Sequence, residues 1–152
     1  MTNNVNNAGG ELLFIQIGNG ATPEVFTASA TINTSRAFSQ TVKTSTTELA
    51  DTVNPSNAAV TARQVMSTDS KFDGKGIADA PSLLTLINWA AAPGAGPKNC
   101  KIAFNRSGAA GGFTVTGPYI LTSLSLDGSA RESLNFSASF EQAGAVVVTA
   151  NA

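Results

Sequence analysis

Two stretches of this chain alternate regularly between apolar and polar residues. In residues 24–33 the apolar Phe26, Ala28, Ala30 and Ile32 alternate with polar residues, and residues 131–141 repeat this pattern. A period of two places successive side chains on opposite faces of an extended backbone, so both stretches predict β-strands with one buried face. The polar residues 33–36 then predict a hairpin turn that leads into the next strand.

Shorter apolar or alternating runs predict further strands, separated by residues typical of turns. Residues 73–76 contain two residue pairs that end in glycine, Asp-Gly and Lys-Gly, and predict turns. Residues 117–118 are Gly-Pro and predict a bulge or a strand break, because proline lacks the N–H that a central strand donates. The further strands are expected at residues 11–17, 37–43, 60–67, 99–105, 111–126 and 145–149.

One segment has the spacing of an amphipathic helix. Apolar residues of 81–92 recur every three or four positions, and Pro81 suits a first helical turn. Asp79 or Ala80 would lie near the N-cap, and the Pro-Gly pair that follows the segment would end the helix. We expect Trp89 on this helix to cover the flank of the sheet.

Together these elements predict a mainly β fold. We expect a β-barrel or β-sandwich of two packed antiparallel sheets, with one flanking α-helix and one long loop. The length of 152 residues lies within the range of about 100 to 200 that is typical of one domain. Residues 1–152 are therefore expected to form a single domain, with the polar residues 1–10 as an N-terminal arm.

The long loop is expected at residues 44–57. This segment shows no sustained apolar period, and it contains Ser, Thr, Asp and the helix-breaking pair Asn54-Pro55. Long loops without secondary structure are uncommon in compact domains and usually have a function. The segment is therefore a candidate contact surface.

Charge is scarce in this chain. Charged residues make up 12% of the sequence, against about 25% in an ordinary soluble domain, and the formal net charge is −1 without any basic run. Strong binding to nucleic acid is therefore disfavoured. The first ten residues lack the pattern of an export signal, which favours assembly in a cytoplasm, and no apolar stretch approaches the about 20 residues that span a bilayer. Cys100 is the only cysteine, so no intrachain disulfide can form, and we expect it in the core.

Residues that would carry out chemistry are almost missing. The chain has no histidine, which removes the usual general base, the Ser-His-Asp triad and the commonest metal ligand. Asp69, Asp73 and Asp79 lie close in sequence but lack the alternating ligands and the closing Glu of a calcium loop. The glycine-containing segments 18–20 and 74–76 match no phosphate-binding motif. We therefore expect no catalytic, cofactor-binding or metal-binding residues.

The order of the features resembles one known family. A strand at residues 26–32 precedes the long polar loop, and a proline-started helix follows at residues 81–91. The end reads GFTVTG at 112–117, LTSLSL at 121–126 and ESLNFSASFE at 132–141. In this arrangement the chain resembles the tail tube, or major tail, proteins of long-tailed bacteriophages (siphophages) and of gene transfer agents.

The resemblance implies a structural role in a virion tail. Members of that family form homohexameric rings by self-assembly, and the rings stack into a hollow tube through which DNA leaves the particle. Other expected partners are the tape measure, tail tip and terminator proteins, with assembly in the bacterial host cytoplasm. The loop at 44–57 would contact a neighbouring subunit, and its candidate contact residues are Thr44, Thr47, Glu48, Leu49, Val53, Asn54 and Pro55.

Two other classes of protein stay open from the residues alone. A small β-sandwich that binds sugars or proteins would require a cluster of exposed aromatics, and Trp89 and Tyr119 are the only Trp and Tyr in the chain. A pilus or surface-layer subunit would also assemble but would need export. An enzyme ranks below both, because neither a histidine nor a nucleophile motif is present.

Overall fold

The computed structural model describes residues 12–152 apart from residues 30, 93 and 95, so the predicted N-terminal arm at residues 1–10 lies outside the described part. The chain divides into two compact units. We call them the hairpin arm, Ser39–Ser70, and the body, which comprises the described residues up to Phe38 and from Lys71 onward.

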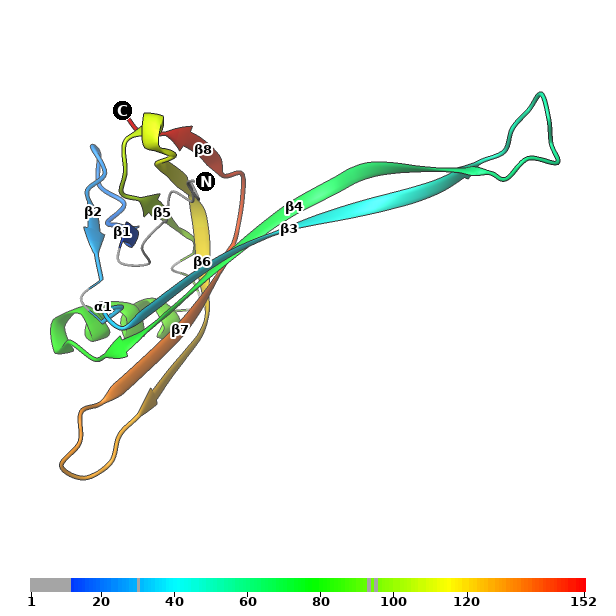
Figure 1. The fold of residues 1–152 in the computed structure, drawn as a ribbon. Coiled ribbons are helices and arrows are strands. Elements are labelled where there is room, and N and C mark those ends of the chain that lie inside the picture. The colour runs from blue at the N-terminus through cyan, green and yellow to red at the C-terminus, as the bar shows by residue number, and fades with distance from the viewer. Residues whose placement is uncertain (1–11, 30, 93, 95) are drawn as a thin grey trace, which may run out of the picture. The chain divides into compact units, whose positions relative to one another are not determined.

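The elements are β1 (Leu13–Gly18), β2 (Phe26–Ala28), β3 (Ser35–Leu49), β4 (Val60–Ile77), α1 (Ala80–Ala91), β5 (Lys98–Phe104), the 3-10 turn η2 (Gly108–Ala110), β6 (Phe113–Asp127), β7 (Asn135–Gln142) and β8 (Val147–Ala150), as Figure 1 shows.

Hydrogen bonds join all the described strands into one sheet. Its order is β2-β1-β5-β6-β7-β4-β3, and β8 also pairs with β6. The mainly β class with one flanking helix is confirmed, but the two predicted sheets are continuous with each other. The cause is the length of β6, which pairs with β5 and β8 along its first half and with β7 along its second half.

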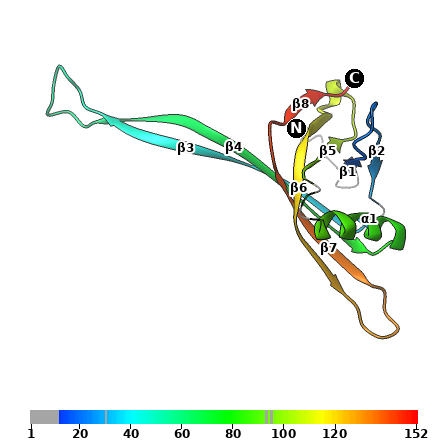
Figure 2. The ribbon, with the colours of Figure 1, turned by 180° about the vertical axis from the view of Figure 1, so that it is seen from behind.

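The core of the body is aromatic and lies where α1 meets the sheet. Figures 1 and 2 show α1 beside the sheet from opposite sides. The ring of Phe140 stacks on that of Phe72 with 4.4 Å between centroids, and Tyr119 meets Phe72 edge-on at 4.9 Å. Trp89 of α1 lies 5.7 Å from Phe140 and is 6% exposed, which confirms its predicted place against the sheet. Alternation in β7 is also confirmed, since Phe136, Ala138 and Phe140 are buried.

The helix begins where the sequence predicts. Asp79 is the N-cap, and its carboxylate accepts a hydrogen bond from the backbone N–H of Ser82 at 3.3 Å. Pro81 lies in the first turn, where its missing N–H leaves no intrahelical bond unmade. Leu86 and Trp89 form the buried side of α1.

Five local predictions are wrong. The strand predicted over residues 24–33 is confined to β2, and Ala28 on its predicted buried face is exposed. Residues 44–49 belong to β3, so the predicted loop at 44–57 shrinks to the segment between Leu49 and Val60. Residues 33–36 form no hairpin turn, because β2 pairs with β1 and not with β3. Residues 73–76 are not turns but part of β4, and β6 runs through residues 117–118 without a break.

Close backbone approach explains the glycines inside β4. A side chain at Gly74 would collide with Ile32, and one at Gly76 would collide with the backbone of Thr31 and with Asn33. The chain that enters β3 therefore crosses directly over β4, where only glycine leaves room. Asn33 fixes this crossing, since its side-chain amide donates to the carbonyl of Ile77 at 2.9 Å and its Oδ1 accepts from the N–H of Ile77 at 3.0 Å.

Proline is tolerated within β6 because of the partners it meets there. Two strands share one edge of β6: β8 pairs with its residues up to Thr116, and β7 pairs with its residues from Tyr119 onward. Pro118 lies at the changeover between the two strands, where its carbonyl accepts from the N–H of Ala143 at 2.9 Å. The N–H group that proline lacks would therefore point into the gap between the β6–β8 ladder and the β6–β7 ladder.

Candidate assembly site

The predicted contact residues all lie in the hairpin arm, and all are exposed. Four of them lie on β3 and three in the segment that connects β3 to β4. Because side chains alternate along a strand, Thr44 and Glu48 share one face of β3, while Thr47 and Leu49 share the other. The exposed candidates are Thr44, Thr47, Glu48, Leu49, Val53, Asn54 and Pro55.

The arm has almost no core of its own. It is described in full, and Ser70 is its only buried residue. An isolated two-stranded hairpin is marginally stable in water, because two strands alone cannot bury an apolar face. An arm of this kind becomes stable when another surface covers it, so its geometry suits a contact with another molecule.

Sequence reasoning missed three apolar residues on the returning strand. Val60, Val65 and Met66 of β4 are 68%, 64% and 62% exposed, comparable to Leu49 at 54%. Val65 and Met66 are neighbours, so they lie on opposite faces of the strand and leave neither face purely polar. The available signal was this pair of adjacent apolar residues in a segment without alternation, which indicates a strand that no core covers.

The tip of the arm is organised by one carboxylate. Oδ1 of Asp51 accepts from the N–H groups of Val53 at 2.9 Å and Asn54 at 3.0 Å, and its Oδ2 accepts from the side-chain amide of Asn57 at 2.9 Å. These bonds favour the ionised form, so the pKa of Asp51 is lowered, mainly by the Asn54 N–H, then by Asn57 and by Val53. The tip is therefore shaped by its own hydrogen bonds.

This arrangement predicts an acid-sensitive tip. Because the folded pKa of Asp51 is below the unfolded value of about 3.9, its contribution is complete above that pH and is lost as the pH falls through the folded pKa. We expect the amide NMR signals of Val53 and Asn54 to shift together below about pH 4. An Asp51→Asn variant should lack this transition. Signals that titrate with the midpoint of an ordinary Asp would contradict the prediction.

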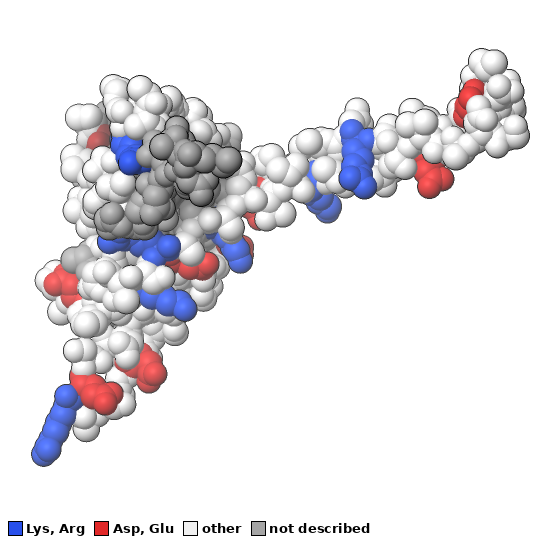
Figure 3. Space-filling view, viewed as in Figure 1, with Lys and Arg blue, Asp and Glu red and all other residues white. Residues whose placement is uncertain are grey.

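Charged residues are spread thinly over both units. Figure 3 shows acidic and basic side chains interspersed on a largely uncharged surface, without a broad area of either sign on the visible face. The chain carries 9 basic and 10 acidic residues. Such a surface offers no continuous stripe for phosphate binding.

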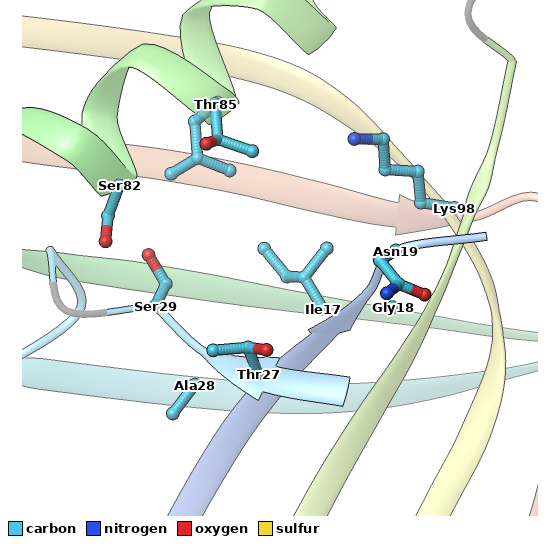
Figure 4. Close-up of a pocket in the computed structure, with 10 residues that line it drawn as sticks. Ile17, Gly18, Asn19, Thr27, Ala28, Ser29, Ser82, Thr85 and Lys98 are labelled. Carbon is cyan, nitrogen blue, oxygen red and sulfur yellow. The ribbon is translucent and has the colours of Figure 1, made fainter. Parts of the chain in front are cut away.

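One pocket opens in the body between α1, β1 and β2, with a volume of about 450 Å³ (Figure 4). Ser82 and Thr85 of α1, Thr27 of β2 and Asn19 give it hydroxyl and amide groups. Lys98 is the only titratable group among the described residues that line it. Lys98 has no acidic partner among these lining residues, so they offer no acid–base pair for catalysis.

The described residues provide no other chemical site. They hold no group of three or more His, Cys, Asp or Glu side chains arranged to bind a metal ion. Cys100 is buried in the core as predicted, and burial raises the pKa of its thiol to about 12. None of the helices in the described part has both the length and the apolar character to cross a membrane. Trp89 and Tyr119 are both buried, so neither forms the exposed aromatic platform of a sugar-binding module.

Comparison with known proteins identifies relatives of this fold. A family model described as "Phage tail tube protein" matches residues 8–148. Among solved structures, the tail of an empty gene transfer agent particle with C6 symmetry is 17% identical, with a TM-score of 0.67 and coverage of 95% of this chain and 100% of that one. The sheath-tube complex of an extracellular contractile injection system is 13% identical, with a TM-score of 0.55 and coverage of 91% and 88%. The SPP1 tail tube is 12% identical, with a TM-score of 0.52 and coverage of 95% and 80%. No curated protein sequence matches the chain.

Proposed function

This chain belongs to the phage tail tube protein family, and from that premise we propose that six copies form a ring and that the rings stack into a hollow tube for DNA delivery. The role is structural and not enzymatic. The tube would lie in a virion tail, be built in the bacterial host cytoplasm, and meet the tape measure, tail tip and terminator proteins of that tail.

The hairpin arm is the observation that carries this proposal. It exposes Leu49, Val60, Val65 and Met66 without a core to cover them, which an isolated soluble protein would avoid. A neighbouring copy of the chain would bury these side chains and order the arm. The related tail of a gene transfer agent has C6 symmetry, which supports six copies per ring.

The distribution of charge supports passage of DNA without retention. A basic channel would bind DNA strongly, because each phosphate neutralised by Lys or Arg releases a counterion. Few and scattered basic residues avoid that affinity. The proposed tube is therefore a conduit and not a nucleic-acid-binding protein.

Electron microscopy of the purified protein, with its mass measured by light scattering, tests the proposal. We expect rings or hollow tubes with six-fold symmetry, and a mass that increases with concentration as stacking proceeds. A monodisperse monomer at every concentration would contradict self-assembly.

A further inference from the structure

The turn between β1 and β2 contains the only Asn-Gly pair of the chain, Asn19-Gly20. Gly20 has a φ of 76°, a left-handed conformation that glycine adopts without strain, and its missing side chain leaves its backbone nitrogen open to close approach. Both residues are exposed, so water reaches them. Figure 4 shows Asn19 directly after β1, beside the pocket. This pair is therefore the asparagine site of the chain that is most open to attack by its own backbone.

Two backbone N–H groups converge on the side-chain oxygen of Asn19. Its Oδ1 accepts from the N–H of Ala21 at 2.9 Å and from the N–H of Val25 at 3.1 Å. The bond to Ala21 closes an Asx turn, which folds the amide of Asn19 back over the backbone nitrogen of Gly20. Donors placed in this way stabilise the negative charge that develops on an amide oxygen when a nucleophile adds to its carbon. Oδ1 of Asn19 thus lies in a small oxyanion hole.

A carboxylate holds the neighbouring N–H group. Oε1 of Glu24 accepts from the N–H of Gly20 at 3.1 Å, and Oε2 accepts from the side-chain amide of Asn99 at 2.8 Å. Gly18 leaves the room for this carboxylate, since a side chain there would collide with it. The two hydrogen bonds fix both oxygens of Glu24, which is half-buried. One turn therefore assembles a nucleophilic nitrogen, a base for its proton and an oxyanion hole.

We propose that this turn modifies itself, with Asn19 converted to aspartate and isoaspartate by attack of the Gly20 nitrogen. As that nitrogen bonds to Cγ of Asn19, its proton passes to the carboxylate of Glu24. The N–H groups of Ala21 and Val25 stabilise the oxyanion that forms. The intermediate then collapses: Nδ2 takes the proton back from Glu24 and leaves as ammonia, and a succinimide ring remains. Water opens this ring at either carbonyl, so the net change exchanges an amide for a carboxylate.

The modification changes the turn in two ways. The product places a second negative charge beside Glu24. The isoaspartate form also routes the backbone through the side chain and so lengthens it by a methylene group between β1 and β2. β2 is three residues long and pairs with β1 alone among the described strands. The reaction therefore loosens β2 at the edge of the sheet, and it does not depend on self-assembly.

Incubation of the purified protein in neutral buffer made with heavy-oxygen water tests the proposal. Peptide mapping by mass spectrometry then counts only residues hydrolysed during the incubation, because each of them takes up a labelled oxygen. Asn19 in the folded protein should be converted at least about tenfold faster than in the same chain unfolded in urea, where the local sequence acts alone. Glu24→Gln should lose most of this acceleration, because glutamine can still accept from the N–H of Gly20 but cannot take up its proton.

The matched control is Glu132→Gln, which removes the same charge at an exposed position between β6 and β7. Faster conversion of the folded wild type, a slow Glu24→Gln variant and a normal Glu132→Gln control would establish the reaction. A folded protein that is no faster than the unfolded chain would overturn it, since the hydrogen bonds would then only hold the amide in place. An unchanged rate in the Glu24→Gln variant would also overturn it. Ring formation is measured separately, so these results leave the proposed function untouched.

Discussion

Replacing residues 42–67 by the dipeptide Asn-Gly should abolish stacking of rings and leave the body folded. The change removes most of the hairpin arm, and Asn-Gly closes a two-residue hairpin between the remaining parts of β3 and β4. The aromatic core of the body lies outside the deleted segment. We expect the circular dichroism spectrum to keep its β character, while tubes are absent at concentrations at least about 100-fold above the wild-type threshold.

Point variants separate the apolar contact from the mere presence of an arm. Val65→Lys and Met66→Lys keep the arm but place a charge on each face of β4 where apolar side chains are exposed. Thr61→Lys adds the same charge at an exposed polar position of the same strand. Electron microscopy should show fewer and shorter tubes for the first two variants and normal tubes for Thr61→Lys. Normal tubes from the deletion variant would show that the arm is not an assembly surface.

The sequence predicts well the elements whose periodicity reports burial. β7 and β5 alternate because one face of each meets the core, and Phe140 and Ile102 are buried as that alternation requires. The helix is equally well marked, since Asp79 and Pro81 are chemical signals of its first turn. In each case the local pattern and the tertiary environment agree.

The same reasoning fails where a strand has no core to face. Residues 44–49 are rich in threonine, which favours extended backbone, yet they were expected as a loop because no apolar period marks them. Alternation of apolar and polar residues reports that one face of a strand is buried, and it does not report the extended backbone itself. Whether the candidate contact residues meet another subunit stays a prediction, and the exposed Val65 and Met66 on the facing strand were not among them.

Glycine inside β4 shows a second limit. A glycine in a polar segment is a good local signal for a turn, and residues 73–76 contain two glycines. These two positions require glycine because residues 31–33, which are far away in sequence, cross over the strand there. Which chain crosses a strand depends on the tertiary fold, so no window of neighbouring residues contains that information.

Phe140→Ala should be the most destabilising truncation in the core. Phe140 is fully buried, stacks on Phe72 at 4.4 Å between centroids and also meets Trp89, so its removal leaves a large cavity between the sheet and α1. Truncation of a buried Phe to Ala typically costs about 3–5 kcal/mol, because transfer and cavity terms add. That loss is a large part of the about 5–15 kcal/mol that stabilises an ordinary domain.

Urea denaturation of the variant that lacks residues 42–67 is the suitable measurement, because assembly would otherwise add concentration-dependent stability. The matched control is Leu126→Ala, since Leu126 lies in the neighbouring strand β6 and is 40% exposed. The control should lose less than about 1.5 kcal/mol, because a half-exposed side chain gives up little burial. Equal losses from Phe140→Ala and Leu126→Ala would contradict a core centred on Phe140. A much larger loss from Phe140→Ala would mean that one aromatic cluster ties α1 to the sheet.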